Sequence, residues 1–257
     1  MSGFYVGVDG KARKVKGGYV GIDGVARKIK KGYIGDENGV ARLCFSTTSF
    51  DPVFANNTWE QIAEACQNNA VPDTWSVGDQ KTMTIGGKSY TIDIIGKNHD
   101  NYSDNSGKAP LTFQLHDCYK ETYRLHSITS NTVWKEVEMR TTTLPSILNL
   151  MPDEVKVNIR EVKKSTCSVN TIDTLFLLSE YEIFGTNEYT SVYNEGVQYE
   201  YYKNGGSKIK KVSGVKSMWW ERSDCNISSY YCAVNANGER SYDTMTSKSG
   251  VSFAFCF

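Results

Sequence analysis

The sequence predicts an α+β protein, with N-terminal β-hairpin repeats followed by a larger domain that has short helices and an antiparallel sheet. Three observations support this class. A short pattern with Asp-Gly turns recurs within the first 45 residues, and the 16 Tyr and 10 Phe favour β-structure. The remaining chain alternates short apolar segments with polar turn residues, and helical periodicity is confined to two regions. We therefore expect two domains, residues 1–45 and residues 46–257.

The N-terminal pattern occurs in three copies, which begin at Tyr5, Tyr19 and Tyr33. The first two copies carry Asp-Gly at their centre, and this dipeptide supplies the positive φ angles of a two-residue turn. Each copy is thus predicted to be a β-hairpin, with Gly7 opposite Ala12 in the first copy. Because an isolated hairpin is marginally stable in water, the repeats need stacking partners. We expect residues 1–45 to form a homo-oligomeric stalk, with a trimer favoured; a monomeric meander packed on the main domain is the alternative.

Charge is distributed unevenly along the chain, although the formal net charge is zero. Residues 1–32 hold six Lys and two Arg against two Asp, which gives this segment +6 and the remainder −6. A basic segment can bind nucleic acid or an anionic surface, but Lys on exposed strands also prevents edge-to-edge pairing. We favour the second interpretation and expect no nucleic-acid partner.

The cysteines, the apolar segments and the N-terminal residues indicate the compartment in which the protein is made. The seven cysteines contain no Cys-x-x-Cys pair, and this spacing in a large domain is typical of reduced, mostly buried thiols. No apolar run approaches the roughly 18 residues of a membrane span, so no membrane insertion is expected. The segment Met1–Phe4 lacks the charged and apolar regions of a secretion signal. The sequence therefore predicts synthesis in a cytoplasm.

The first half of the larger domain contains one clear helix and one clear hairpin. Thr58 and Gln61 have the spacing of a capping box, which predicts a helix over residues 59–68. Gly86-Gly87 predicts a hairpin over residues 82–95. Further expected elements are a loop over 99–108, a strand over 111–115, and a helical region over 134–151 with Pro145 near a first turn and Pro152 closing it.

The second half is predicted to be mostly β-structure. We expect a short buried strand over 175–178 and a surface hairpin within 195–213 that turns at Gly205-Gly206. The final expected elements are strands over 218–222, 230–235 and 251–257, with a turn at Asn237-Gly238. The aromatic residues at the two ends of this last segment are expected in the core; they are Trp219, Trp220, Phe253 and Phe255.

Between those aromatic ends, residues 223–247 are mostly Ser, Tyr, Asn, Asp, Thr and Gly. Tyrosine provides rigid amphipathic contact at a low entropic cost, while Ser, Asn and Gly provide adaptable hydrogen bonds, as in antibody paratopes. This composition predicts a ligand-binding surface; an ordinary polar loop without a partner is the alternative. The candidate ligand-binding residues are Asp224, Asn226, Ser228, Ser229, Tyr230, Tyr231, Arg240, Tyr242 and Asp243.

Other patterns carry weaker chemical signals. Cys225 and Cys232 are a spaced thiol pair, but an activated thiolate needs an electropositive pocket and no His lies near them in sequence. Structural or incidental thiols are favoured, and a local disulfide in the released virion is the alternative. The acidic loop over residues 99–107 could offer oxygen ligands to calcium, although its spacing is not that of an EF-hand, and a solvated loop is favoured. His116-Asp117 and His126 are not accompanied by a hydrolase motif. We expect no enzymatic activity, no resident metal and no cofactor.

A combination of segments resembles a known group of proteins. The segments are a helix beginning at Trp59, IIGKNHD (94–100), LTFQLHD (111–117), LFLLSEYEIFG (175–185), WWERSD (219–224), AVNANG (233–238) and GVSFAFCF (250–257). Together they resemble C-terminal domains on tail proteins of phages and prophages of gut bacteria. The N-terminal repeats are similar to those that often precede such domains. The resemblance covers nearly the whole chain, and the combination is more specific than any one motif.

That group is in turn similar to the C-type-lectin-like fold, which formylglycine-generating enzymes share with the variable proteins of diversity-generating retroelements. The variable proteins start their last strands with Trp-x-Arg-Ser, matched here by Trp220-Glu221-Arg222-Ser223. They end with Gly-Val-Arg-Pro-Ala-Phe, whereas Ser252-Phe253 replaces Arg-Pro here. The resemblance implies a C-type-lectin-like ligand-display domain over residues 46–257, and diversification by a retroelement stays open.

The resemblance implies a phage tail-fibre or receptor-binding protein, located in the virion after synthesis in the host cytoplasm. Its partners would be a bacterial cell-surface receptor, either glycan or protein, and other phage tail proteins bound through residues 1–45. Multivalent display would compensate for modest affinity at each site. The alternatives are a structural tail or baseplate decoration protein without a ligand, and an oxidase of the formylglycine-generating type.

Overall fold

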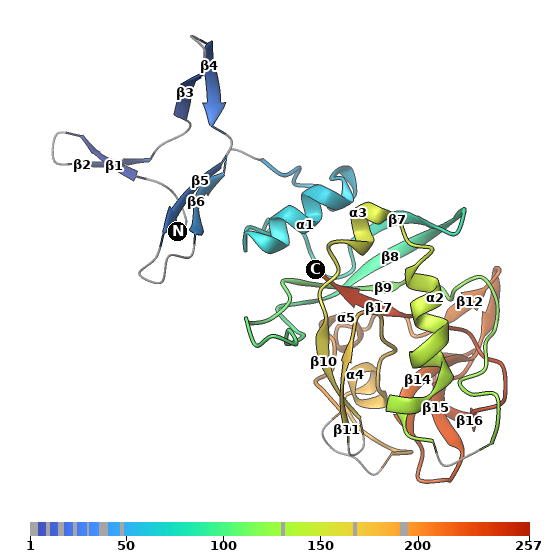
Figure 1. Ribbon diagram of the computed structural model, residues 1–257. Helices are drawn as coiled ribbons and strands as arrows, with labels where there is room; N and C mark the ends of the chain where they lie inside the picture. The colour runs from blue at the N-terminus through green and yellow to red at the C-terminus, as the bar shows by residue number, and fades with distance from the viewer. Residues whose placement is uncertain are drawn as a thin grey trace. The chain divides into compact units, whose positions relative to one another are not determined.

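The computed structural model describes residues 5–8, 11–14, 18–22, 25–29, 31–35, 41–46, 49–129, 132–166, 169–190 and 195–257. The chain divides into two compact units, Met1–Asp51 and Pro52–Phe257 (Figure 1). The regular elements of the described residues are short helices and mostly antiparallel strands, as the sequence predicts. Among these residues, no helix has the length and apolar character needed to cross a membrane.

Six strands of the first unit form antiparallel pairs. They are β1 (Tyr5–Val8) with β2 (Lys11–Lys14), β3 (Gly18–Ile22) with β4 (Val25–Ile29), and β5 (Lys31–Gly35) with β6 (Ala41–Ser46). Gly7 lies opposite Ala12, and Gly21 lies opposite Ala26. The turn residues between the paired strands fall outside the described residues, as do most side chains of this unit. Stacking of the repeats into a stalk therefore stays a prediction.

A four-stranded antiparallel sheet in the order β17-β9-β8-β7 forms the centre of the second unit (Figure 1). Its strands are β7 (Gln80–Ile85), β8 (Lys88–Lys97), β9 (Leu111–Leu115) and β17 (Ala254–Cys256). Ile85 pairs with Lys88 across Gly86-Gly87, which confirms the predicted hairpin. β9 has the predicted bounds and is buried throughout. Phe255 of β17 pairs with Phe113 of β9, so the end of the chain lies inside the core.

The predicted first helix is α1 (Trp59–Gln67), which follows a short 3-10 turn, η1 (Phe54–Asn56). Thr58 and Gln61 exchange both bonds of the capping box, as their spacing indicates. Trp59 contacts an aromatic cluster made of Phe54, Phe113, Phe255 and Phe257, with ring centroids 5.7–6.4 Å from its own. Each such aromatic pair contributes about 0.5–1.5 kcal/mol beyond the area it buries.

A second, three-stranded sheet holds the C-terminal segment. Its antiparallel strands are β14 (Trp219–Asp224), β15 (Tyr230–Val234) and β16 (Arg240–Thr244). Trp219 and Trp220 are fully buried, and so are Phe253 and Phe255, which confirms their predicted core position. The register between β14 and β15 shifts between Trp220 and Asp224. Such an irregularity re-aims side chains, and here it falls on Glu221, Arg222 and Ser223.

The predicted helical region divides into short pieces: η2 (Trp134–Glu136), a π-helical turn η3 (Met139–Thr143), α2 (Leu144–Leu148) and α3 (Asp153–Lys156). Pro145 lies in the first turn of α2, as predicted. Pro152 does not close that helix but occupies the N-cap of α3. A proline has no N–H to donate and therefore suits the start of a helix as well as the residues after one.

Two expectations for the middle of the chain are wrong, and two elements there were not expected. Residues 175–178 are buried but form no strand, because only Phe176 makes a single bridge, to Ala254. The expected hairpin at Gly205-Gly206 is replaced by α5 (Glu200–Lys203) and by a pair of strands, β12 (Lys210–Val212) and β13 (Val215–Ser217). That pair turns at Ser213-Gly214, where both φ angles are positive. A second hairpin, β10 (Val162–Thr166) with β11 (Val169–Asp173), and a helix, α4 (Glu180–Phe184), were not expected.

Candidate functional site

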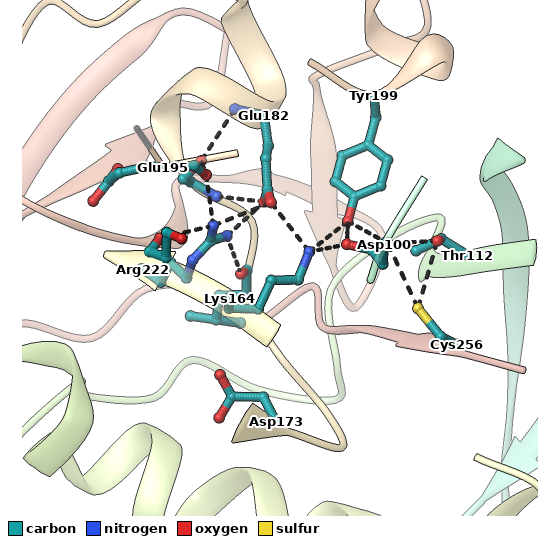
Figure 2. Close-up of polar contacts among 12 residues, drawn as sticks. Asp100, Thr112, Lys164, Asp173, Glu182, Glu195, Tyr199, Arg222 and Cys256 are labelled. Carbon is teal, nitrogen blue, oxygen red and sulfur yellow. Dashed lines mark hydrogen bonds and ion pairs between the residues drawn. The ribbon is translucent and has the colours of Figure 1, made fainter. Parts of the chain in front are cut away.

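A buried ionic network lies between the sheets of the second unit (Figure 2). At one end, Lys164 of β10 donates to Asp100, in the loop after β8, and at 2.8 Å to the hydroxyl of Tyr199. The Tyr199 hydroxyl lies 2.9 and 3.0 Å from the two Asp100 oxygens. Thr112 of β9 donates to the same carboxylate at 2.6 Å. Asp100 is therefore an internal anion with hydrogen bonds from three elements.

The other end of the network is a two-pronged Arg–Glu pair. Arg222 of β14 donates to both carboxylate oxygens of Glu182, on α4, at 2.5 and 3.1 Å. Lys164 joins the two ends, because its Nζ also lies 3.1 Å from Glu182 Oε1. The Arg222 guanidinium further donates to the backbone oxygens of Leu177 at 3.0 Å and Glu195 at 2.8 Å. Parallel Arg–carboxylate bonds of this kind fix orientation as well as charge.

One glycine beside the network has no substitute. Gly196 has φ +117°, and a Cβ at this position would lie 2.7 Å from Glu182 Oε1. A side chain there would both strain the backbone and displace the carboxylate that Arg222 binds. The geometry of the Arg222–Glu182 pair thus depends on the absence of a side chain at position 196.

Burial and charge act in opposite directions on the two carboxyls. Burial raises the pKa of Asp100, but the Lys164 ammonium, the neighbouring His99 and hydrogen bonds from Lys164 and Thr112 outweigh it and lower the pKa from 3.8 to about 2. Burial likewise raises the pKa of Glu182, and the nearby Arg222 and Lys164 charges bring it below its usual value. Two anions and two cations therefore alternate through the interior.

The network is inaccessible to a ligand. The four charged side chains are between 0 and 4 % exposed. The Lys164 ammonium also lies 3.9 Å from the centre of the ring of Phe176, which is fully buried. Its arrangement orders backbone segments and offers no reacting group to solvent. Most of the predicted loop over residues 99–107 is exposed, as expected for a solvated loop, but Asp100 and Tyr102 face the interior.

A third buried carboxylate, that of Glu180, connects this interior to the surface. Glu180, at the start of α4, accepts hydrogen bonds from the backbone N–H groups of Glu188 (3.0 Å) and Tyr189 (3.3 Å). Its Oε1 lies 3.1 Å from Nε of Arg240, one of the predicted binding residues on β16. Arg240 also stacks on Phe184, 4.3 Å from the ring centre. Arg240 is therefore held in place rather than free to follow a ligand.

Five of the nine predicted binding residues line one cavity of about 200 Å³. They come from the end of β14, the loop that follows it and the start of β15. The lining residues are Asp224, Ser228, Ser229, Tyr230 and Tyr231, together with Thr132, Val133, Cys225, Ile227 and Met245. The chain bends between β14 and β15, on one side of the cavity, and this bend includes Ser229, which has φ +69°. Most of the lining polar groups are hydroxyls, which can both donate and accept hydrogen bonds.

The other predicted residues lie around this cavity rather than in its lining. Tyr242 is 39 % exposed and meets Tyr230 and Tyr189 edge-to-face, with ring centroids 5.7 and 4.9 Å away. Arg240 lines a separate open cavity of about 430 Å³. Asn226 is exposed, and its backbone N–H donates to the backbone carbonyl oxygen of Tyr189 at 2.9 Å. Tyr189 was absent from the sequence prediction because it lies far along the chain from residues 223–247.

Two of the predicted binding residues, Tyr231 and Asp243, form hydrogen bonds that stabilise the fold. Tyr231 is buried, and its hydroxyl donates to the backbone oxygen of Thr132 at 2.8 Å. It therefore contributes to the cavity floor, not to an exposed contact surface. Asp243 accepts a hydrogen bond from Ser247 at 2.8 Å, which fixes the turn after β16. Substituting either residue would test folding together with binding.

The two cysteines of the segment are in contact. Cys225 lines the cavity, and its sulfur lies 3.4 Å from that of Cys232, which is buried. The hydrogen bond with Cys225, burial and the neighbouring Glu221 raise the pKa of the Cys232 thiol far above its usual value. Glu221 is itself 1 % exposed, and its carboxyl has no hydrogen-bond partner among the described residues. Burial and the nearby carboxyls of Glu180 and Glu195 raise the pKa of Glu221 well above its usual value.

His116 pairs with the carboxylate of Asp93 and not with that of Asp117, its neighbour in the sequence. Its Nδ1 lies 2.9 Å from Asp93, a buried residue of β8. The hydrogen bond with Asp93 raises the pKa of His116. The side-chain contacts described for this imidazole are with Asp93 and, at 3.1 Å, Gln80, and neither is a nucleophile. The pair alone therefore gives no basis for hydrolytic chemistry.

The Arg–Glu pair should dominate the stability of the second unit. We expect Arg222→Met to lower the free energy of unfolding by roughly 3–5 kcal/mol, because Glu182 would stay buried without its cation. The matched control is Arg160→Met, which removes an exposed ion pair with Asp104 and should cost less than about 1 kcal/mol. Urea unfolding measures both values. Equal costs for the two variants would contradict the assigned role of Arg222.

The depressed pKa of Asp100 predicts loss of stability in acid. Its ion pair contributes fully above the unfolded value of 3.8, and the contribution is lost as the pH falls towards the folded value of about 2. We expect a decrease of roughly 2 kcal/mol in the free energy of unfolding from this carboxyl. Urea unfolding at several pH values measures the slope. In Asp100→Asn that part of the slope should vanish, and an unchanged slope would be the contrary result.

Comparison with known proteins gives one match. The family described as a domain of unknown function, DUF6273, matches residues 106–257, which is more than half of the chain. No curated protein and no solved structure matches the chain. The matched region includes the Lys164, Glu182 and Arg222 part of the network and the whole C-terminal segment. The chain belongs to the DUF6273 family.

Proposed function

We propose that this chain is a phage tail-fibre or receptor-binding protein, in which the second unit recognises a ligand on the bacterial host surface. One observation carries the proposal: five residues selected for a binding composition line a single cavity, and Tyr242 extends that surface beside Tyr230. The ligand is a glycan or a protein of the bacterial surface, and the mechanism is recognition without chemical turnover. The neighbouring Ser228-Ser229 and Tyr230-Tyr231 side chains give adaptable hydroxyls beside rigid ring contacts.

The interior network supports this role by making the surface rigid. Arg222 precedes the cavity-lining Asp224 on β14, and Glu180 forms an ion pair with Arg240 on β16, at the other edge of the same sheet. A preorganised surface loses less conformational entropy when a ligand binds, so weak individual contacts yield more affinity. A loop of the same composition without such support would have to order itself at each binding event.

We further propose a C-type-lectin-like architecture for residues 46–257. Its support is the resemblance at Trp220-Glu221-Arg222-Ser223, together with the central place of Arg222 in the network. Diversification of residues 223–247 by a retroelement is part of this proposal, and the Ser252-Phe253 departure is its weakest point. Ser252 is buried and donates to the backbone oxygen of Leu115 at 2.8 Å, so it has a structural use of its own.

The first unit is proposed to attach the protein to other tail components of the virion and to oligomerise it, with a trimer favoured. Each described strand pair in this unit forms a two-stranded sheet, and each strand is four to six residues long. Two-stranded hairpins of this length are marginally stable alone. Pairing with equivalent segments of other chains would supply the missing packing, and repeated display would raise the avidity for a host cell.

Two other functions compete with receptor binding. A structural tail or baseplate decoration protein would use the same fold without a ligand. An oxidase of the formylglycine-generating type is favoured by the contact between Cys225 and Cys232. Such chemistry needs a low-pKa thiolate in an electropositive site, whereas the pKa of Cys232 is raised and buried Glu221 lies nearby. The thiol environment therefore favours recognition over oxidation catalysis.

Binding should depend on the exposed tyrosines of the cavity surface. We expect labelled full-length protein to bind intact cells or purified surface glycans of at least one strain in a bacterial panel. Tyr230→Ser with Tyr242→Ser should weaken that binding about tenfold or more. The reason is that tyrosines which a ligand covers on binding contribute a large share of the binding energy. The matched control is Tyr90→Ser, a half-buried tyrosine of β8 outside this surface. Unchanged adsorption by the double variant would refute the proposed surface, and absence of binding across the panel would favour the decoration protein.

Oligomerisation should depend on the first unit. We expect light scattering to give a trimer for the full chain and a monomer for a chain that begins at Ser46. The second unit begins at Pro52 and is compact by itself, so the shorter chain retains that unit intact. Far-ultraviolet circular dichroism of the shorter chain provides the folding control. A monomer in both cases would contradict the stalk.

A further inference from the structure

The contact between Cys225 and Cys232 is closer than ordinary packing requires. Both are free thiols, and their sulfur atoms are 3.4 Å apart. Cys225 is half-buried and lines the cavity, whereas Cys232 is 1 % exposed and lies behind it. The pair thus consists of one thiol that a small molecule can reach and one thiol that only its partner can reach.

We propose that Cys225 and Cys232 are a redox pair that closes an intrachain disulfide across the cavity wall, with a small-molecule disulfide such as oxidised glutathione as the oxidant. The site is a modification site within the candidate binding surface. Its formation does not depend on the proposed function. Only its effect on ligand recognition rests on that proposal.

The backbone geometry allows the bond to form. The backbone N–H of Cys225 donates to the backbone carbonyl oxygen of Tyr230 at 3.0 Å. Cys225 therefore lies opposite Tyr230 on the paired strand and diagonal to Cys232. A disulfide needs a sulfur separation of roughly 2.05 Å, so the two sulfurs must approach by a little over one ångström. The intervening residues 226–228 are exposed, and the register between β14 and β15 is irregular just before Cys225, between Trp220 and Asp224. Side-chain rotation with a small shift of this bend can supply the approach.

The reaction balances in two exchange steps. The Cys225 thiolate attacks one sulfur of glutathione disulfide, which forms a mixed disulfide and releases one glutathione thiolate. The Cys232 thiol then attacks the Cys225 sulfur, and its proton leaves with the second glutathione, which departs as a thiol. The protein loses two electrons and two protons, and the oxidant becomes two thiols. The hydrogen bond with Cys225 is the largest cause that keeps Cys232 protonated, and the first step removes it.

The bond would restrain the part of the chain that forms the cavity. The closed ring runs from Cys225 to Cys232 and includes the cavity residues Ser228, Ser229 and Tyr230. A short loop that is closed covalently has fewer conformations when unliganded and unfolded. Oxidation should therefore stabilise the domain and preorganise the surface for its ligand. The reduced form would present the same residues on a looser bend.

Peptide mapping of the full chain tests the proposal directly. After incubation with oxidised glutathione at mildly alkaline pH and blocking of the remaining thiols, trypsin releases residues 223–240, which contain both cysteines. We expect this peptide to be unblocked and lighter by two hydrogen atoms, and a reductant to restore two blockable thiols. The thermal unfolding midpoint should rise by several degrees on oxidation and return on reduction. Recovery of the peptide with both thiols blocked would overturn the proposal.

Single-cysteine variants separate the two steps. Cys232→Ser should stop at a stable mixed disulfide with one glutathione on Cys225, and Cys225→Ser should leave Cys232 unmodified because it is buried. If Cys232→Ser does not fold, Cys232→Ala provides the same test. Glutathione on Cys232 in the Cys225→Ser variant would contradict the assigned order. Slower dissociation of oxidised than reduced protein from bound cells would support the effect on recognition, whereas disulfide formation without any cell binding would uphold the redox pair and reject the receptor function.

Discussion

The buried pair of Arg222 and Glu182 is the interaction on which the second unit depends. It joins the final sheet to α4 through two parallel hydrogen bonds, and the same guanidinium holds the backbone oxygens of Leu177 and Glu195. Removing charges from water is unfavourable, so such a pair is maintained only where its geometry satisfies nearly every polar atom. Here Lys164 and Asp100 extend the alternation of charge, and each carboxylate has more than one donor.

This arrangement explains how an irregular surface can be held in a fixed shape. The segments around the cavity contain little apolar mass, and several of their residues are half-buried or exposed. Their positions derive from what lies below them: Arg222 anchors β14, and Glu180 binds the backbone at Glu188 and Tyr189. Arg240 links the Glu180 carboxylate to β16. Polar interior contacts have defined directions, whereas apolar contacts do not, so they specify one orientation of the strands.

Local features were predictable where local chemistry decides the structure. The capping box at Thr58 and Gln61, the turn at Gly86-Gly87 and the buried strand β9 all follow from residues within a few positions of each other. The errors arose where distant partners decide. Residues 175–178 have the composition of a strand, but only Phe176 finds a bridging partner. α5 forms where turn residues suggested a hairpin, because Tyr199 and Tyr202 are drawn into the core.

By itself, the sequence determined the mixed class, the mostly antiparallel pairing, the aromatic core positions and the polar composition of residues 223–247. These properties follow from periodicity, turn chemistry and the transfer of apolar side chains out of water, which act over a few residues. Only the tertiary structure decided that Arg222 meets Glu182, that Tyr189 joins Tyr242, and that Cys225 touches Cys232. Charged and polar residues look alike in sequence whether they face solvent or one another. Their partners are fixed by the register and crossing of strands that lie far apart along the chain.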